Sequence, residues 1–300
     1  MNREELYLKL ILKTLHDRHG VDFSLYRETT LERRLARRMT ATRSDSYEAY
    51  FSILEKHPEE YGHLAADLAI KVSRFFRNQH LFDLLSNDLF PCVLNEKEAR
   101  SDRSLRIWCA GCAFGEEVYS VAITLVECLD RMRKKVEDYS VSIFGTDIDQ
   151  PALIRAGFGE YQARAFREAR QEIIDKYFIL SEQTGSEPSG GAAGKAAAYR
   201  VVDSIRSLAH FSMHDLASET RKSPPAGVVA NYDMIFCRNV LIYFSKSLQE
   251  RAFSNLVSSL NRGGYLILGR AESIPEALES VLIPHSSSRK VYRKSLKSTL

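Results

Sequence analysis

Two adjacent glutamates that follow a glycine turn are the first residues in this sequence whose types and spacing indicate chemistry. Residues 105–110 (LRIWCA) are apolar and β-prone apart from one arginine, which predicts a buried strand. Gly111 and Gly115 come next, and Glu116 and Glu117 then occupy the first turn of a predicted helix, where the helix dipole favours anions. A strand, a glycine turn and a helix in this order form the ligand-binding corner of a doubly wound α/β sheet.

The charge of this corner restricts the ligand. A dinucleotide site uses the pattern G-x-G-x-x-G to bring a pyrophosphate to the start of a helix. Here the glycine pattern is incomplete, and the two carboxylates would repel a phosphate but attract a cation. S-adenosylmethionine has this character, because it joins an adenosine to a sulfonium and an ammonium group and carries no phosphate. A purely structural turn is the alternative interpretation of this motif taken alone.

A second pair of acidic residues ends the next predicted strand. Residues 139–148 (YSVSIFGTDI) are rich in β-formers, and Asp147 and Asp149 lie at their carboxyl end. An acid in this place can accept both ribose hydroxyls of an adenosine. We assign this role to Asp147, and we expect Asp149 to cap the helix that begins near Pro151.

Two further apolar runs complete the predicted sheet. Residues 232–244 (YDMIFCRNVLIYF) begin as a central strand that is followed by Arg238 and Asn239, and residues 263–271 (GGYLILGRA) form another strand after a Gly-Gly turn. We expect residues 289–294 to pair with residues 281–283 as a hairpin that closes the sheet. The fold class predicted is therefore α/β, with a doubly wound, Rossmann-like sheet of the methyltransferase type.

The chain is long enough for two domains. It has 300 residues, of which 44% are hydrophobic. We predict an N-terminal helical domain and linker over residues 1–76, with helices at about 4–18, 30–39, 47–56 and 59–76. A catalytic domain follows over residues 77–300. The segment 181–198 is rich in Gly, Ala and Ser and is interpreted as a flexible surface loop.

Cysteine content and net charge exclude several classes of protein. The five cysteines form no disulfide framework, and the C-x-x-C motif of Cys109 and Cys112 has no second ligand pair nearby. We assign both to packing and expect no metal. The net charge of +3 is too small to indicate nucleic-acid binding. The charged start of the chain lacks a signal-peptide pattern and no apolar run could span a membrane, so we expect a cytoplasmic protein without membrane insertion.

Five sequence blocks, in a fixed order and with suitable separations, resemble the CheR family of chemotaxis-receptor methyltransferases. Members of this family esterify receptor glutamates with S-adenosyl-L-methionine and release S-adenosyl-L-homocysteine. The resemblance covers nearly the whole chain and also implies a small inserted β subdomain at about residues 178–208. The matching blocks are residues 73–78 (SRFFRN), 115–120 (GEEVYS), 146–149 (TDID), 236–244 (FCRNVLIYF) and 263–272 (GGYLILGRAE).

The resemblance implies a set of site residues in this chain. The linker that closes over the cofactor contains Lys71, Ser73 and Arg77. Glu117 and Asp147 hold the methionine and ribose parts of the cofactor, with Gly111 beside them, and Asp215 and Leu216 flank its adenine. Arg238 and Asn239 complete the pocket, and Arg77 and Tyr243 face the site of methyl transfer. The family usually has a small polar residue in place of Phe114. We therefore expect the ring of Phe114 to crowd the cofactor.

The implied reaction needs little acid–base chemistry. A glutamate side chain is ionised at neutral pH and already nucleophilic, since its reference pKa is about 4.3. Placement of the two reactants should therefore supply most of the rate. We predict that Arg77 orients the incoming carboxylate through its planar guanidinium. Tyr243 is predicted to line the path of the methyl group, and the alternative for Tyr243 is a core aromatic.

A basic stripe is predicted on the second helix of the N-terminal domain. We expect Thr29 and Glu32 to form a capping box at its start. Each pair of like charges at helical spacing costs a few tenths of a kcal/mol of helix stability. The stripe therefore favours a docking surface for an acidic partner over a merely solvated face. The resemblance implies that this partner is a receptor. The stripe consists of Arg33, Arg34, Arg37 and Arg38.

Two other functions remain as alternatives at this level. A nucleic-acid methyltransferase that acts on base amino groups would usually carry an Asn/Asp-Pro-Pro-aromatic turn after the strand at residue 232, and this chain has Cys-Arg-Asn there instead. A non-catalytic S-adenosylmethionine-binding signalling module is the other alternative. We expect a monomer.

Overall fold

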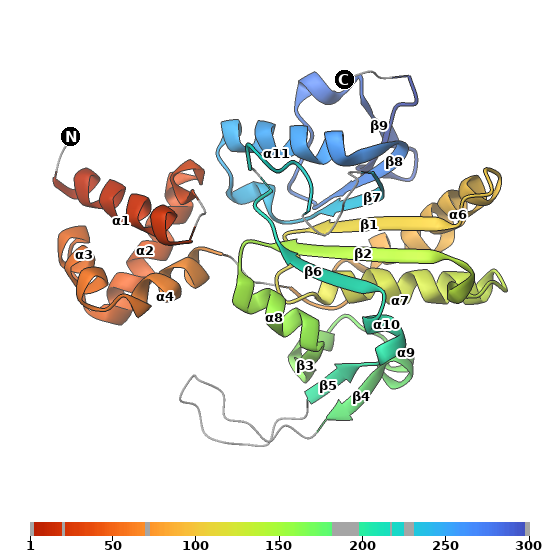
Figure 1. The fold of residues 1–300 in the computed structure, drawn as a ribbon, viewed down its shortest axis with the longest axis horizontal. Coiled ribbons are helices and arrows are strands. Elements are labelled where there is room, and N and C mark those ends of the chain that lie inside the picture. Colours follow the sequence, from red (N-terminus) through yellow and green to blue (C-terminus); the bar gives the residue numbers. More distant parts are fainter. Residues whose placement is uncertain are drawn as a thin grey trace.

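The computed structural model describes residues 3–19, 22–69, 73–181, 198–216, 218–224 and 231–297. A small helical unit lies beside a larger α/β body, and one linker joins them (Figure 1). Among the described residues, no helix combines the length and the apolar character that crossing a bilayer requires.

The helical unit packs around its own apolar core. Its helices are α1 (Arg3–His19), α2 (Glu28–Thr42), α3 (Tyr47–Lys56) and α4 (Glu59–Leu68). Apolar side chains from all four helices are fully or almost fully buried between them, because each helix presents them at helical spacing. The buried set includes Ile11, Leu15, Leu35, Tyr50 and Leu64.

Two predictions for this unit are wrong in detail. The fourth helix ends at Leu68 instead of continuing to Phe76, and Ala69 after it is extended. The early end frees the linker to reach the α/β body. The capping box at Thr29 is also absent, because α2 begins two residues earlier than predicted, at Glu28, and Arg27 precedes it without a side-chain cap.

The α/β body is built on a seven-stranded sheet, which confirms the predicted fold class. The strand order is β6-β2-β1-β7-β8-β10-β9. The first five strands in this order are parallel, and β10 runs antiparallel to both of its neighbours, β8 and β9. The order reverses next to β1, which is where α/β sheets bind ligands. The strands are β1 (Ser104–Ala110), β2 (Ser140–Asp147), β6 (Ala209–Met213), β7 (Tyr232–Cys237), β8 (Leu260–Leu268), β9 (Leu282–His285) and β10 (Ser288–Lys294).

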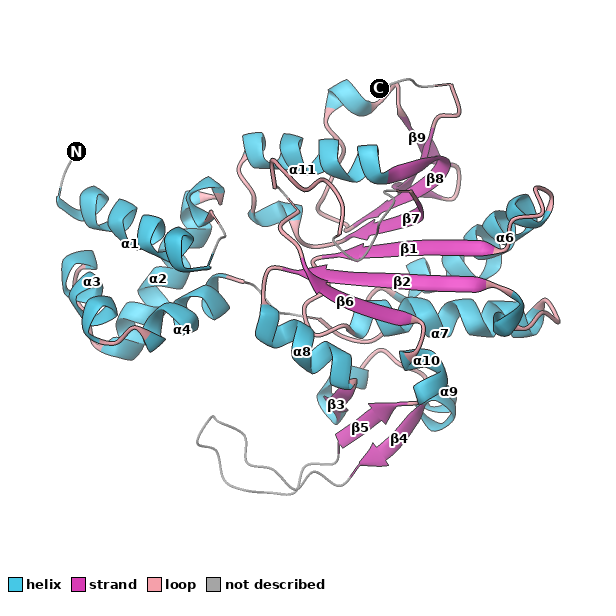
Figure 2. Cartoon of the chain, viewed as in Figure 1, coloured by secondary structure: helices cyan, strands magenta, loops and turns pink. Residues whose placement is uncertain are grey.

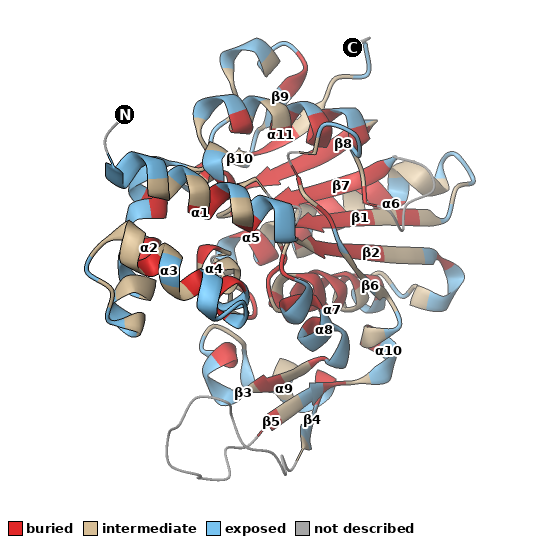
Figure 3. Ribbon diagram, turned by 60° about the vertical axis from the view of Figure 1, so that its left-hand side comes forward, coloured by how far each residue is buried: buried red, intermediate tan, exposed pale blue. Residues whose placement is uncertain are grey.

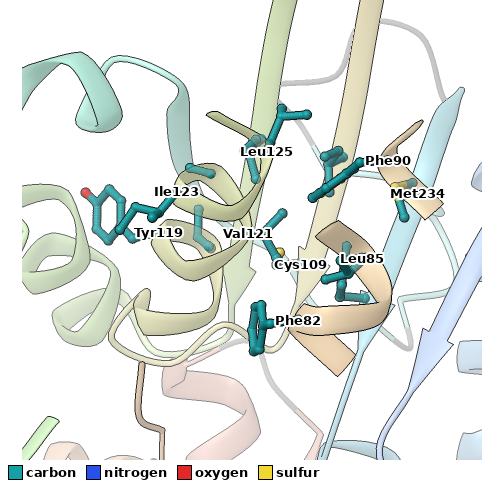
Figure 4. Packing of buried hydrophobic residues seen from close by; sticks show 14 of the residues in the cluster. Phe82, Leu85, Phe90, Cys109, Tyr119, Val121, Ile123, Leu125 and Met234 are labelled. Carbon is teal, nitrogen blue, oxygen red and sulfur yellow. The ribbon is translucent and has the colours of Figure 1, made fainter. Parts of the chain in front are cut away.

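Helices cover both faces of this sheet (Figure 2). One face packs against α5 (Gln79–Leu84), a π-helical turn (Leu85–Leu89), α6 (Phe90–Glu98), α7 (Glu116–Arg131) and α8 (Gln150–Phe158), and the other packs against α11 (Lys246–Ser259). Alternate residues of β1 explain this division, since Ile107 and Cys109 belong to the first cluster and Trp108 and Ala110 to the second. The central strands are buried along most of their length (Figure 3), and Figure 4 shows the first cluster from close by.

A second, three-stranded antiparallel sheet lies beside the main one. Its order is β3-β5-β4, with β3 (Glu160–Gln162), β4 (Phe178–Ser181) and β5 (Ala198–Val201). The helices α9 (Gln171–Tyr177) and α10 (Asp203–Arg206) accompany it. Phe75 of the linker packs edge-on against Tyr161 of β3 and Phe178 of β4, with ring centroids 4.8 and 5.0 Å apart, so this small sheet also anchors the linker. Most of the loop predicted at 181–198 lies outside the described residues.

The predicted closing hairpin is confirmed, with β9 and β10 paired through His285 and Ser288.

Candidate active site

A pocket lies at the carboxyl ends of β1, β2 and β7, where the strand order reverses. Residues from the linker, from the turns after these strands and from the helical unit line it. Nearly all the site residues singled out in the sequence come together here, namely Ser73, Arg77, Gly111, Glu117, Asp147, Asp215, Leu216, Arg238, Asn239 and Tyr243. Lys71 lies outside the described residues.

The turn after β1 is shaped by glycine and tied to β2. Gly111 has a φ of +72°, and a Cβ there would lie 2.3 Å from Cγ2 of Val240, so only glycine fits. The backbone N–H groups of Gly111 and Cys112 both donate to the carbonyl of Thr146, at 2.8 and 2.9 Å. The turn and the end of β2 therefore form one rigid wall of the pocket.

Asp147 is held in place by backbone donors. Its carboxylate accepts from the N–H of Ala113 at 2.9 Å and from the N–H of Asp149 at 3.1 Å. Burial raises the pKa of Asp147, and these backbone hydrogen bonds oppose the shift. Asp149 caps α8 by accepting from the N–H of Ala152 at 2.9 Å, which confirms the predicted cap.

Glu117 and Arg238 form a buried ion pair across the pocket wall. Nη1 of Arg238 lies 2.7 Å from Oε2 of Glu117, and the two side chains are only 5% and 15% exposed. Nη2 of Arg238 donates to the carbonyl of Arg77 at 2.8 Å. Burial raises the pKa of Glu117, while Arg238 opposes the shift. The pair joins the end of β7, the start of α7 and the linker.

Glu272 holds the turn after β7. Its buried carboxylate accepts hydrogen bonds from the N–H groups of Asn239, Val240, Leu241 and Gly269, over distances of 2.6–2.9 Å. Asn239 has a φ of +60°, a conformation that non-glycine residues seldom adopt and that this clamp stabilises. Glu272 is the last residue of the block 263–272 (GGYLILGRAE), but nothing in the local pattern indicated this role.

Three carboxylates line the pocket, and Arg238 pairs with one of them, Glu117. The pKa of Glu117 and that of Asp147 are raised mainly by burial, and Asp215 adds a third carboxylate to the lining. A cationic ligand would offset the cost of desolvating these carboxylates, whereas a phosphate would increase it. This set of carboxylates fits a sulfonium compound that carries an adenosine.

Comparison with protein families decides the identity. A family model described as the CheR methyltransferase SAM-binding domain matches residues 71–290, and one described as the CheR methyltransferase all-alpha domain matches residues 7–69. The chain belongs to the CheR methyltransferase family. It is an S-adenosylmethionine-dependent methyltransferase, as its sequence predicted.

Named relatives of this methyltransferase match it over most of their length. The chemotaxis protein methyltransferase of Listeria innocua is 30% identical over 255 residues, which are 85% of each chain. Chemotaxis protein methyltransferase 2 of Pseudomonas aeruginosa is 31% identical over 258 residues, or 86% of this chain and 83% of the relative. The chemotaxis protein methyltransferase of Salmonella typhimurium is 27% identical over 271 residues, or 90% and 84%.

The helical unit of the methyltransferase contributes a pocket residue that the sequence analysis missed. Tyr26 lines the pocket and packs edge-on against Phe244, with ring centroids 5.1 Å apart. The N–H of Arg27 donates to the carbonyl of Tyr243 at 2.9 Å. Burial raises the pKa of Tyr26, with smaller contributions from Asp215 and Asp147. No local signal distinguishes this tyrosine, because its position depends on how two domains meet.

The linker contributes Ser73, Arg74 and Arg77 to the pocket, and Tyr243 also lines it. Two further hydrogen bonds hold the linker backbone. The N–H of Phe76 donates to Oγ of Ser120 at 2.9 Å, and the N–H of Phe75 donates to the carbonyl of Ala165 at 3.0 Å. Tyr243 is half-buried in the 3₁₀ turn Leu241–Tyr243. It therefore lines the pocket and is not a fully buried core residue.

Phe114 lies in a different place from the one predicted. The described residues that line the methyltransferase pocket do not include Phe114, which lines a neighbouring groove instead. Its ring lies under the guanidinium of Arg155, 4.7 Å from ring centroid to Cζ. The larger side chain is therefore accommodated outside the pocket.

The basic stripe of α2 is not uniform. Arg33 and Arg37 are exposed and Arg34 is half-buried. Arg38, in contrast, donates to both carboxylate oxygens of Glu60, at 2.9 and 2.6 Å. This bidentate pair ties α2 to α4, so Arg38 has a structural task inside the helical unit.

No group of three or more His, Cys, Asp or Glu side chains in the described part of the chain is arranged to hold a metal. Cys112 lines the pocket, whereas Cys109 belongs to the apolar core beneath it. Burial raises the pKa of both thiols well above the usual value, which favours their protonated form.

Proposed function

We propose that this methyltransferase transfers the methyl group of S-adenosylmethionine to glutamate side chains of chemotaxis receptors, forming glutamyl methyl esters. The observation that carries the proposal is the pocket itself, with acidic walls at the strand ends and an arginine-bearing linker beside them. The names of the relatives support a role in chemotaxis. We further propose that the protein acts as a monomer in the cytoplasm, without inserting into membranes or binding nucleic acid.

The donor would be held by residues from three strand ends. We assign the methionine part to Glu117 with Arg238 and Asn239, and the ribose to Asp147 beside Gly111. Asp215 and Leu216 would flank the adenine. These assignments follow the family pattern, and the raised pKa of Glu117 and that of Asp147 support them, since a bound cation stabilises both charged forms.

When bound, the donor supplies a methyl group that the positive charge of its sulfonium activates. The target carboxylate is ionised at neutral pH, so no residue of the site needs to act as a general base. Arg77 would orient this carboxylate, and Tyr243 would close the opposite side and exclude water from the approach. Ser73 and Lys71 belong to the same linker and would follow it over the donor.

Recognition of the receptor would begin on α2. Arg33, Arg34 and Arg37 are proposed to attract the acidic methylation region of a receptor, and the ion pair of Arg38 with Glu60 would hold the helix in position. The proposed division of the chain into residues 1–76 and 77–300 places this surface on a domain of its own. The small sheet β3-β5-β4 would be the inserted subdomain.

The test is transfer of a tritiated methyl group from the donor to receptor-bearing membranes. A carboxyl methyl ester releases tritiated methanol after mild alkali, whereas a methylated amine or base does not. We expect alkali-labile label in the receptor band. Donor binding without any transfer would identify a non-catalytic module, and label in RNA or DNA would identify a nucleic-acid methyltransferase; either result would overturn the proposal.

A further inference from the structure

A second groove lies next to the donor pocket and shares Ser73 and Arg74 with it. We call it the arginine groove, after Arg74, Arg155, Arg164 and Arg167 in its lining. It runs between the linker, the last turn of α8 and the segment that follows β3. It is therefore continuous with the linker side of the donor pocket.

Three of the four arginines have their charge available. Arg155, Arg164 and Arg167 are exposed, and no ion pair joins any of them to another described residue. Arg155 is held over the ring of Phe114. Arg74 differs, because it lies 3.2 Å from Oε1 of Glu168.

The carboxylates in the groove do not cancel this charge. Its lining contains Glu116 and Glu160. Glu116 is only 5% exposed, its Oε2 has no hydrogen-bond partner, and the nearby Arg155 partly offsets its charge. Burial raises the pKa of Glu116. With Arg74 paired to Glu168, the remaining three guanidinium groups exceed the two carboxylates of the lining, so the groove keeps a positive charge that attracts anions.

The backbone that carries the arginines is rigid. Ala165 and Phe166, between Arg164 and Arg167, are buried, and the carbonyl of Ala165 accepts from the N–H of Phe75 at 3.0 Å. The segment is therefore fixed to the linker of the active site. Exposed like charges on a rigid turn repel one another, and an acidic ligand relieves that repulsion.

We propose that the arginine groove binds acidic side chains that flank the target glutamate on the receptor helix. This inference rests on the proposed receptor-methylation function and adds a second contact to that of α2. Residues three, four or seven positions apart lie on one face of a helix, about 5–10 Å apart along its axis. A helix that places one glutamate in the donor pocket thus presents neighbouring carboxylates to the adjacent groove.

The decisive variant reverses two charges, Arg164→Glu with Arg167→Glu. We expect the KM for receptor to rise about tenfold, because two attractive contacts become repulsive. The rate at saturating receptor and the Kd for S-adenosylmethionine, measured by calorimetry, should stay within about twofold, since neither residue lines the donor pocket. The milder variant, Arg164→Gln with Arg167→Gln, should give an intermediate KM.

The matched control is Arg100→Glu with Lys135→Glu. Both residues are exposed and precede β1 and β2, so they lie at the amino ends of these strands, whereas the donor pocket lies at the carboxyl ends. This control therefore changes the net charge by the same amount but at a different place. We expect a KM close to that of the unaltered enzyme. The KM of the unaltered enzyme should also rise with salt more steeply than that of the groove variant.

The outcomes separate this inference from the function on which it rests. If the unaltered enzyme methylates receptors and the groove variants keep its KM, the groove has no part in recognition. An equal rise in KM for the control would reduce the effect to net charge and would equally refute the inference. Failure of the unaltered enzyme to methylate any receptor would instead refute the proposed function.

Discussion

Arg77 and Arg238 lie side by side at the pocket but have different tasks. The guanidinium of Arg238 is engaged by Glu117 and by the carbonyl of Arg77, so it stabilises the wall. The Arg77 backbone is held by that hydrogen bond, which does not involve its side chain. A substitution at Arg77 can therefore remove the side chain and leave this hydrogen bond in place.

Replacing Arg77 with alanine should lower kcat about 100-fold, because the target carboxylate loses the group that orients it. The Kd for S-adenosylmethionine should change by no more than about threefold, since Arg238 still donates to the backbone of residue 77. Steady-state kinetics and calorimetry check this pair of values. A variant with normal turnover would remove Arg77 from the mechanism.

Replacing Glu272 with glutamine should weaken both stability and donor binding. The amide N–H₂ would face backbone donors that now point at a carboxylate, and each hydrogen bond to a buried charge contributes about 1.5–3 kcal/mol. We expect a Tm lowered by several degrees and a larger Kd for the donor, measured by thermal melting and calorimetry. The exposed Glu276→Gln is the control, and equal effects in both variants would refute the clamp.

His214 should make the free enzyme sensitive to acid. Burial lowers its pKa from 6.5 to about 4, and its Nε2 has no hydrogen-bond partner. Below pH 6.5 the imidazole binds a proton in the unfolded chain but stays neutral in the folded state. The contribution of His214 to the free energy of unfolding is therefore fully present above pH 6.5 and is lost as the pH falls towards about 4. The loss is at most about 3 kcal/mol. Urea unfolding of His214→Phe should show a shallower decline over that window, and an unchanged decline would contradict the assignment.

The segment before α2 connects the helical unit to the pocket. It brings Tyr26 against Phe244 and pairs with the turn that carries Tyr243. The N–H of Ser245 also donates to the carbonyl of Leu25 at 3.0 Å. The donor pocket is therefore completed by a segment about 200 residues away in the sequence.

Replacing Tyr26 with alanine should raise the Kd for the donor about fivefold to tenfold, because a ring that lines the pocket is lost. Tyr26→Phe keeps the ring and should bind nearly as tightly as the unaltered enzyme. Calorimetric titration distinguishes the two. If alanine is tolerated as well as phenylalanine, the helical unit does not help to hold the donor.

Local patterns predicted the elements whose signals are local. The glycine turn after β1 and the cap at Asp149 could both be predicted from neighbouring residues. The three-residue strand β3 could not, because its pairing partner β5 lies far along the chain. The end of α4 at Leu68 was also missed, since apolar residues continue into the linker but pack against a different domain.

For the whole molecule, the sequence defined the donor site better than the surfaces around it. Motifs name residues at strand ends, and parallel strands bring those ends together whatever the rest of the chain does. Tyr26, the four donors to Glu272 and the arginine groove depend on how separate elements meet. Phe114 illustrates the limit, since its size was evident in the sequence but the direction of its ring was not.

The central claim is that a cationic methyl donor binds between the acidic walls at the reversal of strand order. A crystal structure of the protein with S-adenosylmethionine tests it most directly. We predict the ribose at Asp147, the methionine part at Glu117 and the methyl group facing Arg77 and Tyr243. Donor density elsewhere, or a phosphorylated nucleotide in this corner in its place, would contradict the account.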